Sequence, residues 1–179
     1  MLTAFLAAAA AAALPAPACR IDRAVYRLNA DPAYTAGFAR QDRRKVSLGS
    51  DLVFWLKTPG RTYWFYLASP NGYGGTYIAP DIDPRAAAKL DDEAVAARPQ
   101  AEPALIPLDA FRPNLEAYPS PPQSSDSAPA LLFARGLGPE LWYEPARLSG
   151  GDESAAQESM PVGLFQPAGC GGPPAPALK

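Results

Sequence analysis

The chain has 179 residues, a net charge of −2 and a hydrophobic fraction of 48%, which predicts one domain with a packed core. It contains no histidine, so Ser-His-Asp and Cys-His nucleophile systems and His-ligated zinc or haem are excluded. Two cysteines alone cannot form a Cys₄ zinc site or hold an iron–sulfur cluster, and we expect no metal and no cofactor. The 22 prolines and 14 glycines argue against a helical bundle.

The N-terminal residues 1–18 carry no charged side chain and are typical of a signal peptide. An apolar run from Leu2 to Leu14 precedes Ala16-Pro17-Ala18, whose small residues suit a signal peptidase. We therefore expect export, with cleavage after Ala18. The alternative is an alanine-rich helix that stays attached, although the run is shorter than the roughly 20 apolar residues that a bilayer core demands.

Cleavage after Ala18 would leave Cys19 as the first residue, and this cysteine has two interpretations. It is similar to the lipidated cysteine of a bacterial lipoprotein signal, but Ala16 stands where the usual leucine would be. Alternatively, Cys19 pairs with Cys170, the only other cysteine, in an oxidising compartment. We favour this disulfide, which would join the two ends of a domain over 19–170 and leave a loose tail over 171–179.

The first 80 residues show the alternation of apolar and polar side chains that is typical of strands. Residues 21–28 predict a first strand, and the turn signal at 29–32 leads into a second strand over 34–40. A glycine-rich turn at 69–75 then predicts a return strand over 76–79.

The clearest element is an aromatic hairpin, in which strands 51–57 and 62–68 flank Pro59-Gly60. A four-residue loop over 58–61 sets the register of the two strands. In this register Leu56 faces Tyr63, Phe54 faces Phe65 and Leu52 faces Leu67 on one side, while Trp55 faces Trp64, Val53 faces Tyr66 and Asp51 faces Ala68 on the other. We expect the first side to belong to the core.

The second side of this hairpin is also aromatic, and two hypotheses explain it. We favour a cover formed by another layer of the same protein, because aromatic side chains belong more often to cores than to ligand platforms. The alternative is a binding surface on which Trp55, Trp64 and Tyr66 stack against a sugar or a lipid chain. An open aromatic face would support this alternative.

The second half of the chain is less regular. Asp83 and Pro84 predict the start of a short surface helix that runs to residue 97. Eight prolines over 99–129 predict a long irregular excursion. Its possible anchors onto the sheet are Leu105, Ile106, Leu108 and Phe111, and further strands are expected at 130–135, 140–144 and 162–166. The whole pattern predicts a single, mostly β, antiparallel sandwich or partly open barrel of about six to eight strands.

Charge is unevenly spread along the sequence. Residues 19–80 carry nine basic and four acidic side chains, whereas residues 81–179 carry seven basic and fourteen acidic ones. A basic patch that includes Arg43 and Arg44 would suit an anionic polymer or a lipid headgroup, and the plain alternative is a solvated loop. Nucleic acid is not an expected partner, because the overall balance is acidic.

These features separate the classes of function that the sequence allows. An enzyme without histidine would need paired carboxylates, such as Glu140 with Glu144 or Asp81 with Asp83, but nothing places either pair across a cleft. Twelve arginines against four lysines suggest a GC-rich bacterial genome. We expect an exported, monomeric, envelope-associated binding or accessory module, with a glycan, an envelope lipid or another envelope protein as partner. The alternatives are a histidine-independent hydrolase of an extracytoplasmic substrate and a structural lipoprotein anchored through Cys19.

Overall fold

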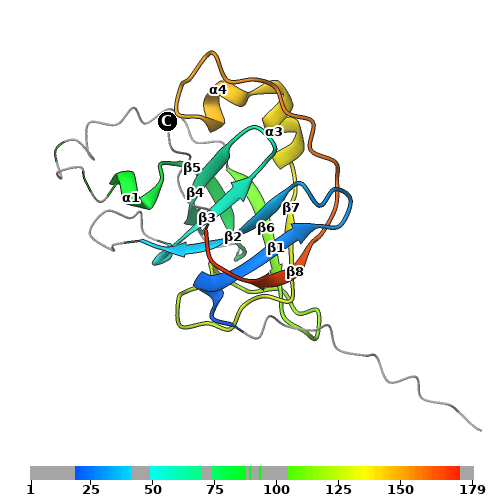
Figure 1. Ribbon diagram of the computed structural model, residues 1–179. Helices are drawn as coiled ribbons and strands as arrows, with labels where there is room; N and C mark the ends of the chain where they lie inside the picture. Colours follow the sequence, from blue (N-terminus) through cyan, green and yellow to red (C-terminus); the bar gives the residue numbers. More distant parts are fainter. Residues whose placement is uncertain are drawn as a thin grey trace, which may run out of the picture.

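The computed structural model describes residues 19–41, 49–69, 74–87, 89, 93 and 105–173, and its strands form a closed antiparallel barrel (Figure 1). The eight strands are β1 (Ala24–Leu28), β2 (Thr35–Arg40), β3 (Leu52–Lys57), β4 (Thr62–Ala68), β5 (Tyr77–Asp81), β6 (Ile106–Phe111), β7 (Leu131–Ala134) and β8 (Phe165–Cys170). Each strand neighbours the next in the sequence, and β8 returns to β1. The predicted mostly β, antiparallel domain is confirmed, with the barrel closed rather than partly open.

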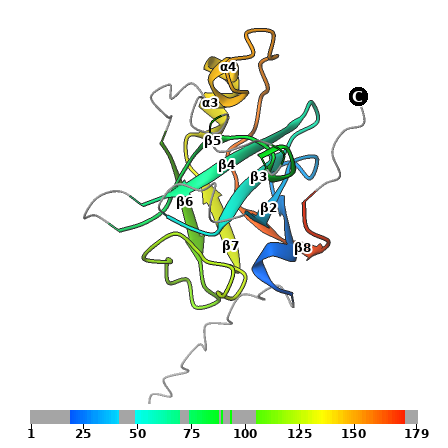
Figure 2. The ribbon, with the colours of Figure 1, turned by 90° about the vertical axis from the view of Figure 1, so that its left-hand side faces the viewer.

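The described helices are short and lie outside the barrel wall. They are the 3₁₀ turn η1 (Ile21–Arg23) and the helices α1 (Pro84–Ala87), α3 (Leu137–Tyr143) and α4 (Pro145–Leu148). Figure 2 shows α3 and α4 over one end of the barrel, with the segment 112–130 at the opposite end. The barrel is therefore a short tube with a separate cover at each end.

The interior of the barrel is filled by side chains, as expected for a ring of eight strands. Buried and less buried residues alternate along β1 and β6, so there the two-residue period separates core from surface. In β3 the residues of both faces are buried, because its outer face is covered as well. The ring of Phe54 is fully buried, and its centroid lies 5.7 Å from that of Phe38 and 6.0 Å from that of Phe65. These aromatic contacts tie three consecutive strands together through their inner faces.

The aromatic hairpin has the predicted register. Trp55 pairs with Trp64, Phe54 with Phe65 and Leu56 with Tyr63 across β3 and β4. Thr58 explains the four-residue loop, because its hydroxyl oxygen accepts hydrogen bonds from the amides of Gly60 (3.2 Å) and Arg61 (3.0 Å). The loop is thus closed by a side chain in its first position, and this closure fixes which residues face each other.

The end of the barrel near α3 is closed by apolar and polar contacts together. Leu137, Leu141 and Leu148 are buried in the main core cluster. Two tyrosines at the rim reach the segment that follows α4: Tyr34 donates to the Ser159 carbonyl (2.9 Å), and Tyr63 donates to a carboxylate oxygen of Glu158 (2.8 Å).

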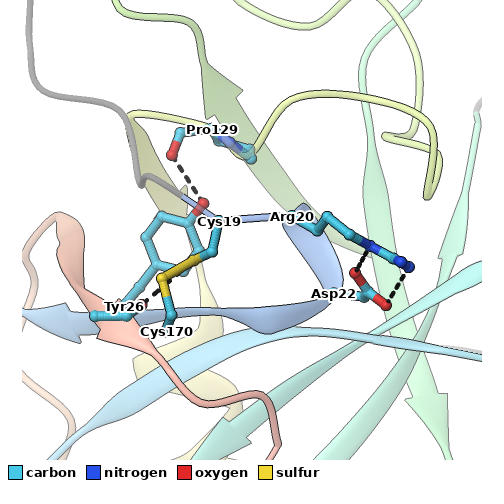
Figure 3. The surroundings of a disulfide bond; sticks show 7 residues. Cys19, Arg20, Asp22, Tyr26, Pro129 and Cys170 are labelled. Carbon is cyan, nitrogen blue, oxygen red and sulfur yellow. Dashed lines mark hydrogen bonds and ion pairs between the residues drawn. A yellow bond between two sulfur atoms is a disulfide. The ribbon is translucent and has the colours of Figure 1, made fainter.

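The opposite end is closed by the segment 112–130. The buried hydroxyl of Tyr26 donates to the Pro129 carbonyl (2.8 Å), as Figure 3 shows. The Gln123 side chain donates to the Gly49 carbonyl (2.9 Å), and the Asp51 carboxylate accepts from the Ser124 amide (2.8 Å). The proline-rich segment 112–130 therefore forms a cover over this end of the barrel.

Four sequence-based predictions of elements need correction or qualification. The first strand, expected at 21–28, begins at Ala24 as β1, because Ile21–Arg23 form the 3₁₀ turn η1. The strand expected at 140–144 is part of helix α3, because Leu137 and Leu141 are buried one helical turn apart. The predicted excursion contains strand β6, in which buried Ile106, Leu108 and Ala110 alternate despite Pro107. The strand expected at 162–166 begins three residues later as β8.

The predicted helix over 84–97 begins as expected. The Asp83 carboxylate accepts from the Arg85 amide (2.9 Å), which is a helix-start contact. Helix α1 spans Pro84–Ala87, and most of the remainder of the predicted helix lies outside the described residues.

Candidate functional site

The aromatic side of the hairpin that the sequence singled out lies on the outer wall of the barrel, and most of it is covered. Trp55 is 2% exposed and Trp64 is 7% exposed, while Tyr66 is half-buried. The two tryptophans form a small cluster of their own with Ala39 and Val53, separate from the barrel core.

Trp55 has a packing role that its surroundings explain. Its ring lies against Gly37 of the neighbouring strand, where the Cβ of any larger residue would be 2.8 Å from the ring atom Cζ2 of Trp55 and 2.6 Å from the Ala24 carbonyl. The indole Nε1 donates to the Phe38 carbonyl at 3.4 Å. In the described contacts the Trp55 ring packs against Gly37. Stacking of a ligand on Trp55 stays a prediction.

Trp64 is covered from outside by an arginine. The guanidinium carbon of Arg85 lies 5.6 Å from the centroid of the Trp64 ring, within the range of a cation–π contact. Asp83 fixes this arginine: Arg85 Nε donates to Oδ1 at 2.9 Å and Nη2 donates to Oδ2 at 2.6 Å. The start of α1 therefore holds Arg85, in its ion pair with Asp83, over the ring of Trp64.

The Asp83–Arg85 pair shifts the pKa of both groups. Burial alone would raise the pKa of the Asp83 carboxyl, but the hydrogen bonds from Arg85 and its charge outweigh burial and lower it. The hydrogen bond with Asp83 raises the pKa of Arg85. The pair therefore stays ionised at neutral pH.

Beside this pair lies an open cavity of about 190 Å³, which we call the outer pocket. It is lined by Asp22, Arg23, Ala39, Arg40, Trp64, Asp83, Pro84, Arg85 and Pro173. These residues come from η1, β2, β4, the start of α1 and the chain after β8, so the closed barrel brings both ends of the domain to one site.

The charges of the outer pocket are partly paired. The Asp22 carboxylate binds Arg40 at 3.1 Å. It also binds Arg20 at 2.8 Å, and Figure 3 shows this second pair. Arg23 is exposed and has no ion-pair partner among the residues that the structure describes. Its backbone carbonyl accepts from the amides of Gly171 (2.8 Å) and Gly172 (3.0 Å), which anchors the chain leading to Pro173.

The other residues that the sequence proposed are placed elsewhere. Arg43 and Arg44 lie outside the described residues. Of the carboxylate pairs, Asp83 binds Arg85, and Glu140 binds Arg147 on the neighbouring helix α4. Nothing in these contacts assembles two carboxylates for acid–base work.

One exposed aromatic pair on α3 does not stand out in the sequence pattern. Trp142 is 43% exposed and Tyr143 is 74% exposed, both on the outer side of α3. A helical interpretation of 137–143 would have found them, because Leu137 and Leu141 then occupy the opposite side. The strand expected at 140–144 does not separate these exposed residues from the buried leucines.

A second, smaller cavity of about 120 Å³ lies beside β7. It is bounded by the end of β7, the start of α3 and the residues 160–163. At this point β7 and β8 share only one ladder pair, Leu132 with Phe165, so the cavity marks the weakest seam of the barrel.

The predicted disulfide is confirmed. Cys19 and Cys170 are bonded, with their Cα atoms 6.1 Å apart, and they join the start of the described chain to the end of β8 (Figure 3). No helix within the described part of the chain is both long and apolar enough to cross a membrane.

Comparison of the chain with protein-family models, curated proteins and solved structures finds no match.

Proposed function

We propose that this chain is an exported, envelope-associated bacterial protein that acts by binding a partner on the outer wall of its barrel. The observation that carries the proposal is the outer pocket, where three arginines and two aspartates surround a tryptophan. The inside of the barrel is filled by side chains and both ends are covered, so the described structure favours the outer wall as the contact surface.

The disulfide supports the location. Cys19 follows directly after the predicted cleavage position, and its bond to Cys170 is of a kind that persists in oxidising compartments. A sulfur atom in a disulfide cannot carry a thioether-linked lipid. The lipid-anchored alternative and the disulfide-bonded protein therefore exclude each other and have different masses.

The location is tested by the intact mass of the full chain expressed in a bacterial host, before and after reduction and alkylation. We expect a mature chain that begins at Cys19 and whose two thiols react only after reduction. An uncleaved chain with free thiols would contradict export, and extra acyl mass on Cys19 would establish the lipoprotein instead.

Binding is tested by co-sedimentation of the purified, oxidised protein with isolated bacterial envelopes. We expect the protein to sediment with the envelopes, and to be released as salt screens the arginines. Protein that stays in the supernatant at low salt would overturn the binding role. Treatment of the envelopes with glycan-degrading enzymes or lipid extraction before the assay separates the partner classes.

A further inference from the structure

The outer pocket has the features of a site for an acidic sugar. We propose that it binds a hexuronic acid residue of a glycan, which carries one carboxylate and several hydroxyl groups on a compact ring. This inference rests on the proposed function and specifies its ligand class.

The cations suit a carboxylate. Guanidinium groups present paired donors in a plane, which matches the two oxygens of a carboxylate. Arg40 and Arg85 are held in place by Asp22 and Asp83, so their orientation is set before a ligand arrives. Arg23 is exposed at the same pocket without an ion-pair partner in the described chain, and it is the cation that we assign to the ligand carboxylate.

The two aspartates distinguish a sugar from a simple anion. Asp22 and Asp83 keep side chains that are 12% and 23% exposed, so their oxygens can accept hydrogen bonds from a ligand. Hydroxyl groups donate to carboxylates, whereas a phosphate carries mainly acceptors and would be repelled by both. A pocket of mixed charge therefore favours a ligand that has both a negative group and hydroxyl donors.

The lining and the size also favour one sugar ring. Ala39, Pro84 and Pro173 offer apolar contact beside Trp64. The volume of about 190 Å³ is below the roughly 300–1,000 Å³ of pockets for drug-sized ligands. The exposed large apolar residues of the described chain are Leu105, Leu115, Trp142, Tyr143 and Val162, and none of them lines this pocket. The pocket thus lacks the apolar side chains that would enter a lipid surface.

The test is a calorimetric or NMR titration of the full, oxidised chain with glucuronic acid, glucose and inorganic phosphate at equal ionic strength. We expect glucuronic acid to bind more tightly than the other two. Arg23→Gln should weaken that binding about tenfold, because it removes one charge-assisted hydrogen-bonding group. Arg27→Gln is the matched control, since Arg27 is also exposed and follows in β1, away from the pocket lining.

Four outcomes would overturn the inference: no binding of glucuronic acid, equal binding of glucose, equal binding of phosphate, or an equal effect of Arg23→Gln and Arg27→Gln. Near-ultraviolet circular dichroism checks that each variant keeps the native packing. If the protein still sediments with envelopes in any of these cases, the ligand class is wrong and the proposed function stands. If it is neither exported nor retained by envelopes, the proposed function itself fails.

Discussion

Gln41 follows β2 in a position where its side chain is only 8% exposed. Neither the nitrogen nor the oxygen of its amide has a hydrogen-bond partner among the residues that the structure describes, where Gln41 is the one buried side chain in this position. A buried polar group without a partner costs roughly 1–3 kcal/mol of stability. Gln41 therefore weakens the native state at the point where β2 ends.

Replacing Gln41 with methionine should raise the free energy of unfolding by about 1 kcal/mol, because an apolar side chain of similar shape removes the unpaired amide. Urea denaturation measures the change. Gln123→Met is the matched control and should destabilise, since the Gln123 amide nitrogen donates to the carbonyls of Gly49 (2.9 Å) and Pro121 (3.1 Å). A loss of stability in Gln41→Met would mean that this amide does have a partner in solution.

Five tyrosines with raised pKa values make the fold sensitive to high pH, and the shift is largest for Tyr26 and Tyr63. Burial raises the pKa of Tyr26, with a smaller contribution from Tyr118, and burial followed by the hydrogen bond to Glu158 raises the pKa of Tyr63. Below the ordinary value of 10.0 both phenols keep their protons in the folded and unfolded chains, so stability is unaffected. Above it the unfolded chain loses these protons and the folded chain keeps them, so stability falls as pH rises.

We therefore expect the urea midpoint to drop steadily as the pH rises above about 10, because the unfolded phenols ionise there and the folded ones do not. Tyr63→Phe should show a smaller drop than the wild type, because it removes one of the shifted groups. Tyrosinate absorbance should rise together with unfolding. A drop of the same size in both proteins would show that Tyr63 does not contribute.

Helix α3 combines a cover for the core with an exposed aromatic surface. Leu141→Ala should lower the free energy of unfolding by about 2–5 kcal/mol, since it empties a fully buried site at the barrel end. Trp142→Ala, one residue along the same helix, should change it by no more than about 0.5 kcal/mol. Thermal or urea unfolding of both variants measures this difference. Similar losses would mean that the outer side of α3 is also packed.

At the scale of elements, sequence reasoning works where pattern and turn chemistry agree. The register of β3 and β4 follows from alternating aromatic residues and a loop of fixed length. The run 140–144 has three apolar or aromatic residues between two glutamates, and this pattern fits a short strand as well as part of helix α3. The prolines around residues 106–111 argue against a strand, although β6 forms there. In both cases the packing partner, which the sequence does not show, decides the structure.

The candidate site could not be read from the sequence for a different reason. Trp64 was singled out, but the outer pocket also needs Arg23 from η1, Arg85 from the start of α1 and Pro173 from the far end of the domain. These residues form no motif, because closure of the barrel alone brings them together. The disulfide, by contrast, was predictable, since only two cysteines were available.

For the whole molecule, the disulfide should be the largest single contribution to stability. The bond joins residues 151 positions apart, and the loss of loop-closure entropy in the unfolded chain corresponds to about 5 kcal/mol. The double variant Cys19→Ser/Cys170→Ser should lose most of this amount in urea denaturation. The wild type with reduced thiols is the control and should match the variant. An unchanged free energy of unfolding would show that the ladder between β1 and β8 holds without the bond.

The pairing of β1 with β8 also determines when folding can finish. The first strand leaves the ribosome, or enters another compartment, long before its second neighbour, and until then one edge of β1 has no strand to pair with. Contacts between such distant segments form slowly, and an unpaired edge promotes aggregation in the meantime. A chain shortened before β8 cannot close the barrel. The newly made protein therefore needs protection from aggregation until β8 has been synthesised and can pair with β1.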